Sequence, residues 1–258
     1  MLTLFLLPDN LYGKQYLPKE LAEVKPTHGM LFDTIEGAGL VGDTSKPATV
    51  LIAGDSHTAH LDAFWDYVGK REGWCAYASA ASSNPFFFDY VFQFRGDTEE
   101  FADKRNKFLS KYYGQYDTIV LSVYWGSKYY AKDPGFIPAM DKALNRLLQE
   151  GKRVYLVNSL YEVADTRIKE YWLEYYGIKL PKRDYLGAIN DSSRAHAERV
   201  REYVQKNFPQ VVWVDLEPYL PRDVMANGKP VLADNNHWNS YGAELVAMRF
   251  TSEKKLLP

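Results

Sequence analysis

The chain has 258 residues, of which 46% are hydrophobic and 25% are charged, and its formal net charge is −2. This length and composition predict one soluble domain with a large core. Lysine and arginine are spread along the chain, so neither nucleic acid nor an anionic membrane is supported as a partner. The only cysteine is Cys75, which excludes an internal disulfide.

Residues 1–47 are predicted to form an N-terminal extension or linker packed on the core. Residues 1–7 are almost wholly apolar, but a membrane-spanning helix needs about 20 apolar residues. The same segment has no basic leader and no small-residue cleavage site, so a signal peptide is not predicted. Residues 10–47 show little periodicity, and one short helix is expected over 19–24.

The α/β core is predicted to fill residues 48–258. Residues 48–53 form an apolar run rich in β-branched side chains, and apolar residues recur at three- and four-residue steps over 57–70. This pattern predicts a buried strand, a tight turn and an amphipathic helix. Four more strands are predicted at 74–79, 117–123, 152–157 and 211–214, and four more helices at 98–113, 137–150, 193–208 and 236–250. Strands that alternate with helices predict a roughly five-stranded parallel sheet covered on both faces.

The turn after the first strand carries Gly54-Asp55-Ser56-His57. Ser56 would lie at the carboxyl end of a strand and the amino end of a helix. Ligands bind at this edge of open α/β sheets, and a helix N-terminus stabilises negative charge. A serine here is also an ordinary helix cap, so the turn alone does not identify a nucleophile. His57 is expected to cap or pack, and His60 to lie at the helix surface.

A second motif, Asp234-Asn235-Asn236-His237, precedes the last predicted helix. An aspartate three residues before a histidine can hold one ring nitrogen while the other faces a serine. This is the arrangement of nucleophile, base and orienter in serine catalysis. The G-x-S-x-G elbow of α/β-hydrolases is absent, because Thr58 occupies its last position. No nucleotide loop and no zinc-binding spacing is present either, and neither a cofactor nor a metal is predicted.

Gly54-Asp55-Ser56 and Asp234-x-x-His237 resemble the first and last blocks of the SGNH (GDSL-type) esterase and acyltransferase superfamily. The run from about 47 to 250 is similar, more narrowly, to SGNH domains fused behind multi-spanning membrane acyltransferase modules. Segments 118–125 and 151–157 contribute to that similarity. The resemblance implies a flavodoxin-like, three-layer α/β/α sandwich. It also implies a catalytic triad of Ser56, His237 and Asp234.

The oxyanion hole is the less complete part of the expected site. Its first donor would be the N–H of Ser56, and the family's second donor maps onto Ala81, after the second strand. The family's third donor is an asparagine after the third strand, where this chain has Tyr124-Trp125-Gly126. Asn84 could supply that donor from a neighbouring loop, although an asparagine before proline is also a common turn residue.

Two tryptophans are candidates for substrate binding. Trp125 agrees with the fused subfamily. Trp238 follows the histidine and either packs on it or offers a platform for a sugar ring. The resemblance implies O-acyl transfer, with acetyl as the expected group, from an acylated donor to a carbohydrate of the bacterial cell surface.

The partner implied by the resemblance is an upstream membrane acyltransferase module of the same protein, and the location is periplasmic or at an extracytoplasmic membrane face. Residues 1–7 would then be either an element packed on the domain or the remnant of that connection. The alternatives are a carbohydrate O-acetyl esterase and a non-catalytic glycan-binding domain. A glycosidase that uses Asp215 and Glu217 would leave both motifs unexplained.

Overall fold

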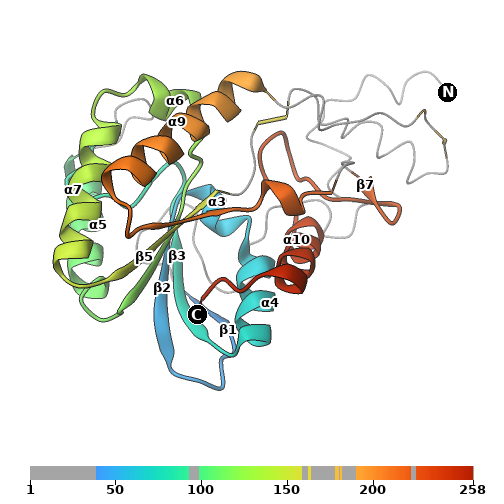
Figure 1. Ribbon diagram of the computed structural model, residues 1–258, viewed down its shortest axis with the longest axis horizontal. Helices are drawn as coiled ribbons and strands as arrows, with labels where there is room; N and C mark the ends of the chain where they lie inside the picture. The colour runs from blue at the N-terminus through green and yellow to red at the C-terminus, as the bar shows by residue number, and fades with distance from the viewer. Residues whose placement is uncertain are drawn as a thin grey trace.

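The computed structural model describes residues 39–92, 99–158, 162–163, 178–179, 181, 190–221 and 225–257. These residues form a central sheet with helices on both of its faces (Figure 1). The predicted three-layer α/β/α architecture is therefore confirmed. The residues before Gly39, with the apolar segment 1–7 and the helix expected over 19–24, lie outside the described residues.

The central sheet has six strands in the order β1-β3-β2-β4-β5-β6. The five strands from β2 to β6 are parallel, and β1 pairs antiparallel with β3 at one edge. In chain order the parallel strands lie 2-1-3-4-5, which is the flavodoxin-like, doubly wound arrangement. The bounds are β1 Gly39–Gly42, β2 Ala48–Gly54, β3 Cys75–Ala80, β4 Thr118–Ser122, β5 Arg153–Asn158 and β6 Val212–Asp215.

All five predicted strands are present, and β1 is an addition. β1 lies in the stretch that the sequence analysis assigns to the extension, so part of that stretch belongs to the sheet. Its four residues begin and end with glycine, which leaves too few side chains to show an alternating pattern. The division of the chain at residue 47 stays a prediction.

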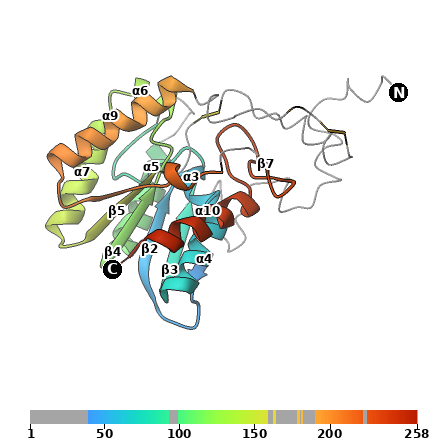
Figure 2. The same ribbon diagram turned by 45° about the vertical axis from the view of Figure 1, so that its right-hand side comes forward.

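Each face of the sheet is covered by its own helices (Figures 1 and 2). Val50 and Ile52 of β2 join one buried cluster, and Leu51 and Ala53 join the other, because successive strand side chains point to opposite faces. The first cluster includes α4 (Asp62–Glu72) and α10 (Ser240–Glu253). The second includes α5 (Glu99–Tyr112), α7 (Phe136–Gln149) and α9 (Asp191–Asn207).

The helix predicted over 57–70 is two helices, α3 (Ser56–Ala59) and α4. The indole N–H of Trp65 donates to the carbonyl oxygen of Thr58 at 2.9 Å. In one continuous helix that carbonyl would accept from the backbone N–H of residue 62. The indole takes that place, and the chain turns between the two helices.

The last helix begins at Ser240, four residues later than predicted. Asn239 is its N-cap, with a side-chain oxygen that accepts from the N–H of Gly242 at 2.8 Å. The residues from Asp234 to Trp238 consequently form a loop before the helix. Three further elements were not predicted, namely α6 (Lys128–Lys132), the 3-10 helix η4 (Glu217–Tyr219) and the hairpin of β7 (Met225–Ala226) and β8 (Lys229–Pro230).

Among the helices of the described residues, none combines the length and the apolar character that crossing a membrane requires.

Candidate active site

The structure places Ser56 at the switch point of the sheet. Strand β2 lies between β3 and β4. The crossover from β2 to β3 runs through α4 and the next one, from β3 to β4, runs through α5 on the opposite face of the sheet. Ser56 lies two residues after the end of β2, as the first residue of α3. In doubly wound sheets this is the position where substrates bind.

Gly54 makes the close approach of this turn to β4 possible. Its φ is +153°, and a Cβ at this position would lie 2.0 Å from the carbonyl oxygen of Ser122 and 2.6 Å from Thr58 Oγ1. The Thr58 hydroxyl also donates to the Ser122 carbonyl oxygen at 2.7 Å. The first turn of α3 is thereby fixed against the end of β4, and Ser56 is fixed with it.

Ser56, His237 and Asp234 lie in one chain of hydrogen bonds. His237 Nε2 is 2.8 Å from Ser56 Oγ, although 181 positions separate the two residues. His237 Nδ1 is 2.9 Å from Asp234 Oδ1 and 2.8 Å from Oδ2. The expected meeting of serine and histidine is therefore found, with the aspartate on the far side of the ring.

The loop that carries Asp234 and His237 is closed by backbone contacts. The N–H of Ala233 donates to the carbonyl oxygen of His237 at 2.9 Å, and the N–H of Asn239 donates to that of Val231 at 3.1 Å. Within the loop, Asp234 Oδ1 accepts from the backbone N–H groups of Asn236 and His237, each at 2.9 Å. These bonds hold the carboxylate in place whether or not it contacts the imidazole.

The same contacts set the charge of Asp234. Burial raises the pKa of this carboxyl group, but the hydrogen bond from His237, its positive charge when protonated and the two backbone N–H groups outweigh burial. The pKa is lowered overall. Asp234 is thus ionised at neutral pH and can stabilise a positively charged imidazole.

Asp55 ties the turn to the neighbouring strand. Its Oδ1 accepts from the N–H of His57 at 2.8 Å, as the N-cap of α3. Its Oδ2 accepts from the N–H of Tyr124 at 2.9 Å and from the Tyr130 hydroxyl at 3.1 Å. Burial raises the pKa of Asp55 to about 6, although these donors oppose the rise. Asp55 is structural, as expected of the residue before the serine.

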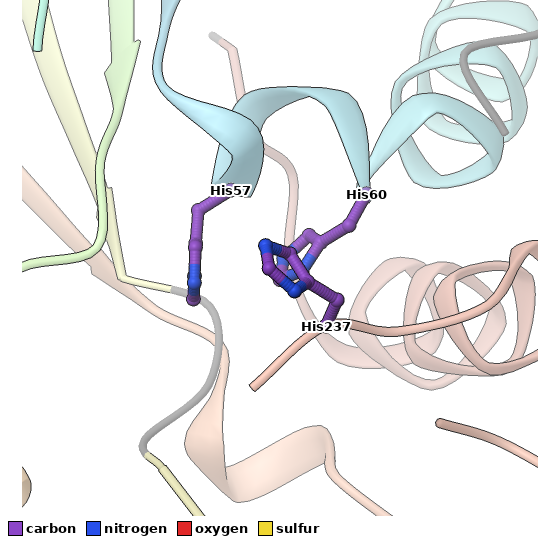
Figure 3. Close-up of side chains that lie close together, drawn as sticks. All are labelled: His57, His60 and His237. Carbon is purple, nitrogen blue, oxygen red and sulfur yellow. The ribbon is translucent and has the colours of Figure 1, made fainter. Parts of the chain in front are cut away.

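Two further histidines lie beside His237 (Figure 3). The ring centroid of His57 is 5.1 Å from that of His237, and the centroid of His60 is 5.5 Å from it. Both rings are buried, so the expectation that His60 lies at the helix surface is wrong. The break between α3 and α4 turns this residue inward. Burial lowers the pKa of both side chains well below the usual value, which keeps them neutral.

The candidate oxyanion donors differ in whether they are available. The N–H of Ser56 makes no hydrogen bond within the part of the chain that the structure describes. The N–H of Ala81 donates to the carbonyl oxygen of Gly54 at 3.1 Å, so the assignment of Ala81 as a donor is wrong. The hydrogen bond from Ala81 to Gly54 continues the pairing of β2 with β3. The N–H of Ser82, one residue later, has no acceptor among the described residues.

Asn84 is held within its loop. Its side-chain oxygen accepts from the N–H of Phe86 at 2.9 Å and from Arg105 Nη1 at 3.4 Å. Its Nδ2 is buried and has no hydrogen-bond partner among the described residues. Asn84 is therefore a turn residue whose Nδ2 donor is unused among the described residues.

The two tryptophans are core residues. Trp125 is 0% exposed, donates from its indole nitrogen to the carbonyl oxygen of Val157 at 2.9 Å, and packs against Trp213. Trp238 is 2% exposed and belongs to the cluster beneath α4 and α10. The assignment of Trp125 and Trp238 to substrate binding is wrong, because neither ring offers an open face.

The carboxylates of the glycosidase alternative have structural partners. Asp215 Oδ1 accepts from Asn158 Nδ2 at 3.2 Å and from the N–H of Glu217 at 3.0 Å. Glu217 forms an ion pair with Arg194. Both residues hold the connection after β6, and neither belongs to the chain of hydrogen bonds around Ser56.

Comparisons with known proteins identify the family and the fold of the chain. Residues 26–252 match the family model described as the SGNH domain (fused to AT3 domains). The periplasmic domain of a lipopolysaccharide acetyltransferase from Salmonella ser. Paratyphi A is similar with a TM-score of 0.57 and 14% identity, over 80% of this chain and 84% of that one. No curated protein matches the chain.

Two other solved structures are less similar. A G-D-S-L family protein from Desulfitobacterium hafniense has a TM-score of 0.47 and 12% identity, over 79% of this chain and 98% of that one. A GDSL-like lipase from Bacteroides thetaiotaomicron has a TM-score of 0.42 and 13% identity, over 79% and 86%.

Proposed function

The chain belongs to the family of SGNH domains fused to AT3 domains, and from this premise we propose that it is an O-acyltransferase. It moves an acyl group, with acetyl as the expected one, to a hydroxyl of a bacterial cell-surface polysaccharide. The observation that carries the proposal is the chain of hydrogen bonds from Ser56 through His237 to Asp234. A serine, a base and an orienter in this order are the parts of an acyl-enzyme mechanism.

In the first half-reaction, Ser56 Oγ attacks the carbonyl carbon of the acyl donor while His237 Nε2 takes the hydroxyl proton. Asp234 holds the Nδ1–H of the ring and stabilises the imidazolium. The tetrahedral intermediate then collapses, and the bond to the leaving group breaks. The leaving group takes the proton from His237, and the acyl group stays on Ser56 as an ester. A base in this position contributes about 10²- to 10⁴-fold in rate.

In the second half-reaction, His237 takes the proton of a sugar hydroxyl, whose oxygen attacks the ester carbon. Collapse breaks the bond to Ser56 Oγ and returns the proton to the serine. Water in place of the sugar would give hydrolysis by the same steps. The triad therefore serves both reactions, and the acceptor decides between them.

The oxyanion of both intermediates needs hydrogen-bond donors. The N–H of Ser56 is the first donor in this proposal. Ser82 takes the place expected for Ala81, since its N–H is not used in the sheet. Asn84 Nδ2 stands as the third candidate because it is buried without a partner among the described residues. Loss of one such donor typically costs about 10²- to 10³-fold in rate.

Two comparisons favour transfer over hydrolysis. The family is one whose members are fused to AT3 domains, which fits an upstream membrane acyltransferase module as the source of acyl groups. One structural relative, with a TM-score of 0.57, is a periplasmic domain of an acetyltransferase. They support a location on the periplasmic or another extracytoplasmic face of a bacterial membrane.

Two alternative functions, an esterase and a glycan-binding domain, would involve the same part of the molecule. A carbohydrate O-acetyl esterase would use the same acyl-enzyme and release it to water. A non-catalytic glycan-binding domain has less support, because Trp125 and Trp238 are buried and offer no sugar platform.

The deciding experiment supplies an activated acetyl ester and a set of surface oligosaccharides, first to the domain and then to membranes that contain it with its acyltransferase module. Mass spectrometry quantifies acetylated sugar and free acetate. Transfer predicts acetylated sugar that disappears in Ser56→Ala and persists in Ser110→Ala, an exposed serine of α5. Free acetate alone, with the module present and across all acceptors, would identify an esterase.

A further inference from the structure

The rings of His57, His60 and His237 offer nitrogen atoms that all lie within 4.8 Å of one another (Figure 3). We propose that they form a binding site for a divalent transition-metal ion such as Zn²⁺, and that the bound ion switches off the acyl transfer. The binding part of this proposal stands on geometry alone, and the inhibitory part rests on the proposed function.

The ligand set suits such an ion. Imidazole nitrogen is a preferred ligand of Zn²⁺, at about 2.0–2.1 Å, and three histidines occur together in known zinc sites. In a tetrahedral site at that distance the nitrogens lie roughly 3.4 Å apart. The spacing found here is within 4.8 Å, so movements of about an ångström, of the size that side-chain torsions allow, would close the site.

The three rings do not lie flat on one another. The plane of the His57 ring is tilted by 44° from that of His60 and by 50° from that of His237, and the planes of His60 and His237 are at 86°. The nitrogen lone pairs lie in the ring planes, so ring planes that intersect are compatible with one shared ion. His57 lies in α3 and His60 is the C-cap of that helix, so the backbone fixes the separation of their Cα atoms.

Each ring is oriented by a contact outside the cluster. His57 stacks on Tyr124, with centroids 4.4 Å apart and planes within 3°. The backbone N–H of Trp238 donates to His60 Nδ1 at 3.3 Å. Binding of the ion through His60 Nε2 would place the ring proton on Nδ1, so this long hydrogen bond is lost when the ion binds. Asp234 holds His237 at Nδ1, which leaves Nε2 as its ligand atom. A carboxylate behind a ligating histidine is a common second layer of metal sites, and it makes the histidine a better ligand.

Inhibition follows from the atom that His237 would contribute. Its Nε2 is the atom 2.8 Å from Ser56 Oγ, and the proposed function requires its lone pair to accept the serine proton. A lone pair given to a metal ion is not available to a proton. The ion and the catalytic step are therefore mutually exclusive, and removal of the ion by a chelator restores activity.

Cobalt(II) is the probe for the test, because its visible absorption is strong in four-coordinate sites and weak in the hexa-aquo ion. We expect the protein to bind one Co²⁺ with intense visible bands, and Zn²⁺ to displace it. Ser56→Ala should bind at least as tightly, because it keeps the three histidines and removes the competing hydroxyl. This variant tests the site without any activity, so failure of the proposed function would not affect the result.

His60→Gln should weaken binding by about tenfold or more, whereas His196→Gln, a buried histidine of α9, should leave it unchanged. X-ray absorption of zinc-loaded wild type counts the imidazole ligands without any variant, and three are expected. Absence of binding at millimolar metal, or a zinc ion with fewer than three imidazoles, would overturn the site. Full activity of the zinc-saturated protein would overturn the inhibition.

Discussion

The carboxylate of Asp55 accepts a hydrogen bond from the backbone N–H of Tyr124 at 2.9 Å, and so joins the end of β2 to the residues that follow β4. The same carboxylate accepts from the N–H of His57 at 2.8 Å, inside the turn that carries Ser56. Two neighbouring central strands are thus connected at the edge where the serine lies. This buried side chain therefore helps to position the nucleophile, together with the hydrogen bond from Thr58 to Ser122.

Asp55→Asn tests this connection. An amide has one acceptor oxygen, so it cannot satisfy the donors of both His57 and Tyr124, and its N–H group would face one of them. We expect a loss of about 1–3 kcal/mol in the free energy of unfolding, the usual cost of an unsatisfied buried donor. Urea denaturation measures it, with Asp103→Asn on the exposed side of α5 as the control. Equal stability of the Asp55 variant and wild type would contradict the structural role.

Gly54→Ala tests the close approach of the turn to β4. The new Cβ would lie 2.0 Å from the Ser122 carbonyl oxygen, and backbone atoms on both sides would have to move. Gly151→Ala is the matched control, because it also has positive φ, +72°, but no atom within 4 Å of the added Cβ. We expect the control to lose about 1 kcal/mol, the usual cost of alanine in the left-handed region.

The clash in Gly54→Ala adds to that conformational cost, so this variant should lose at least about 3 kcal/mol or fail to fold. Thermal and urea unfolding compare the two variants. Similar losses would show that the contact with Ser122 is easily relieved.

The fold could be predicted from the sequence because its strands are apolar runs that alternate with amphipathic helices. All five parallel strands lie within one or two residues of their predicted bounds. Strand β1 was missed, since its edge position and terminal glycines leave no pattern. The β7–β8 hairpin was missed although Asn227-Gly228, both with positive φ, is the usual sequence of such a turn.

The candidate site, like the fold, could be predicted from the sequence only in part. Ser56, His237 and Asp234 belong to local motifs, and the sequence predicts that they meet. Ala81, Trp125 and Trp238 were misjudged, because tertiary packing decides whether an N–H is free or a ring is open. The histidine cluster was missed for a related reason. His57 and His60 are three residues apart, as on one side of a helix, but the sequence does not show that α3 ends at Ala59 or that both rings lie beside His237.

His196 is expected to make the protein sensitive to acid. Its ring is buried in α9, and burial, with a smaller effect of Arg199, lowers its pKa to about 4. The unfolded chain binds a proton below about pH 6.5, whereas the folded protein binds it only near pH 4. Neutral His196 therefore contributes its full share to the free energy of unfolding above pH 6.5, and this contribution is lost as the pH falls toward 4.

Between pH 7 and pH 5, the whole difference in pKa between the folded and unfolded states of His196 would lower the free energy of unfolding by about 2 kcal/mol. About 1 kcal/mol is expected after allowance for water that reaches the ring. His196→Gln should reduce the fall in stability by that amount, as measured by urea denaturation at the two pH values. An unchanged pH dependence in the variant would show that other groups cause the acid sensitivity.

Asp234→Asn should separate the charge of the orienter from its shape. Asparagine can keep the hydrogen bonds of its side-chain oxygen with the backbone N–H groups of Asn236 and His237, both 2.9 Å in the wild type. The loop should therefore fold as before, with an unfolding midpoint close to that of wild type. The amide N–H₂ would then face His237 Nδ1 and donate to it.

A donor at that position forces the ring proton onto Nε2, the atom that faces Ser56 Oγ. The histidine then has no lone pair for the serine proton, so kcat for hydrolysis of p-nitrophenyl acetate should fall by about 10³- to 10⁴-fold. KM should change little, because the substrate does not contact this residue in the proposed mechanism. Asp117→Asn, exposed before β4, is the control and should retain wild-type kinetics. A folded Asp234→Asn protein with kcat within tenfold of wild type would contradict the role of Asp234 as orienter. Both Ser56→Ala and His237→Ala should still be inactive in that case if the serine and the histidine act as proposed.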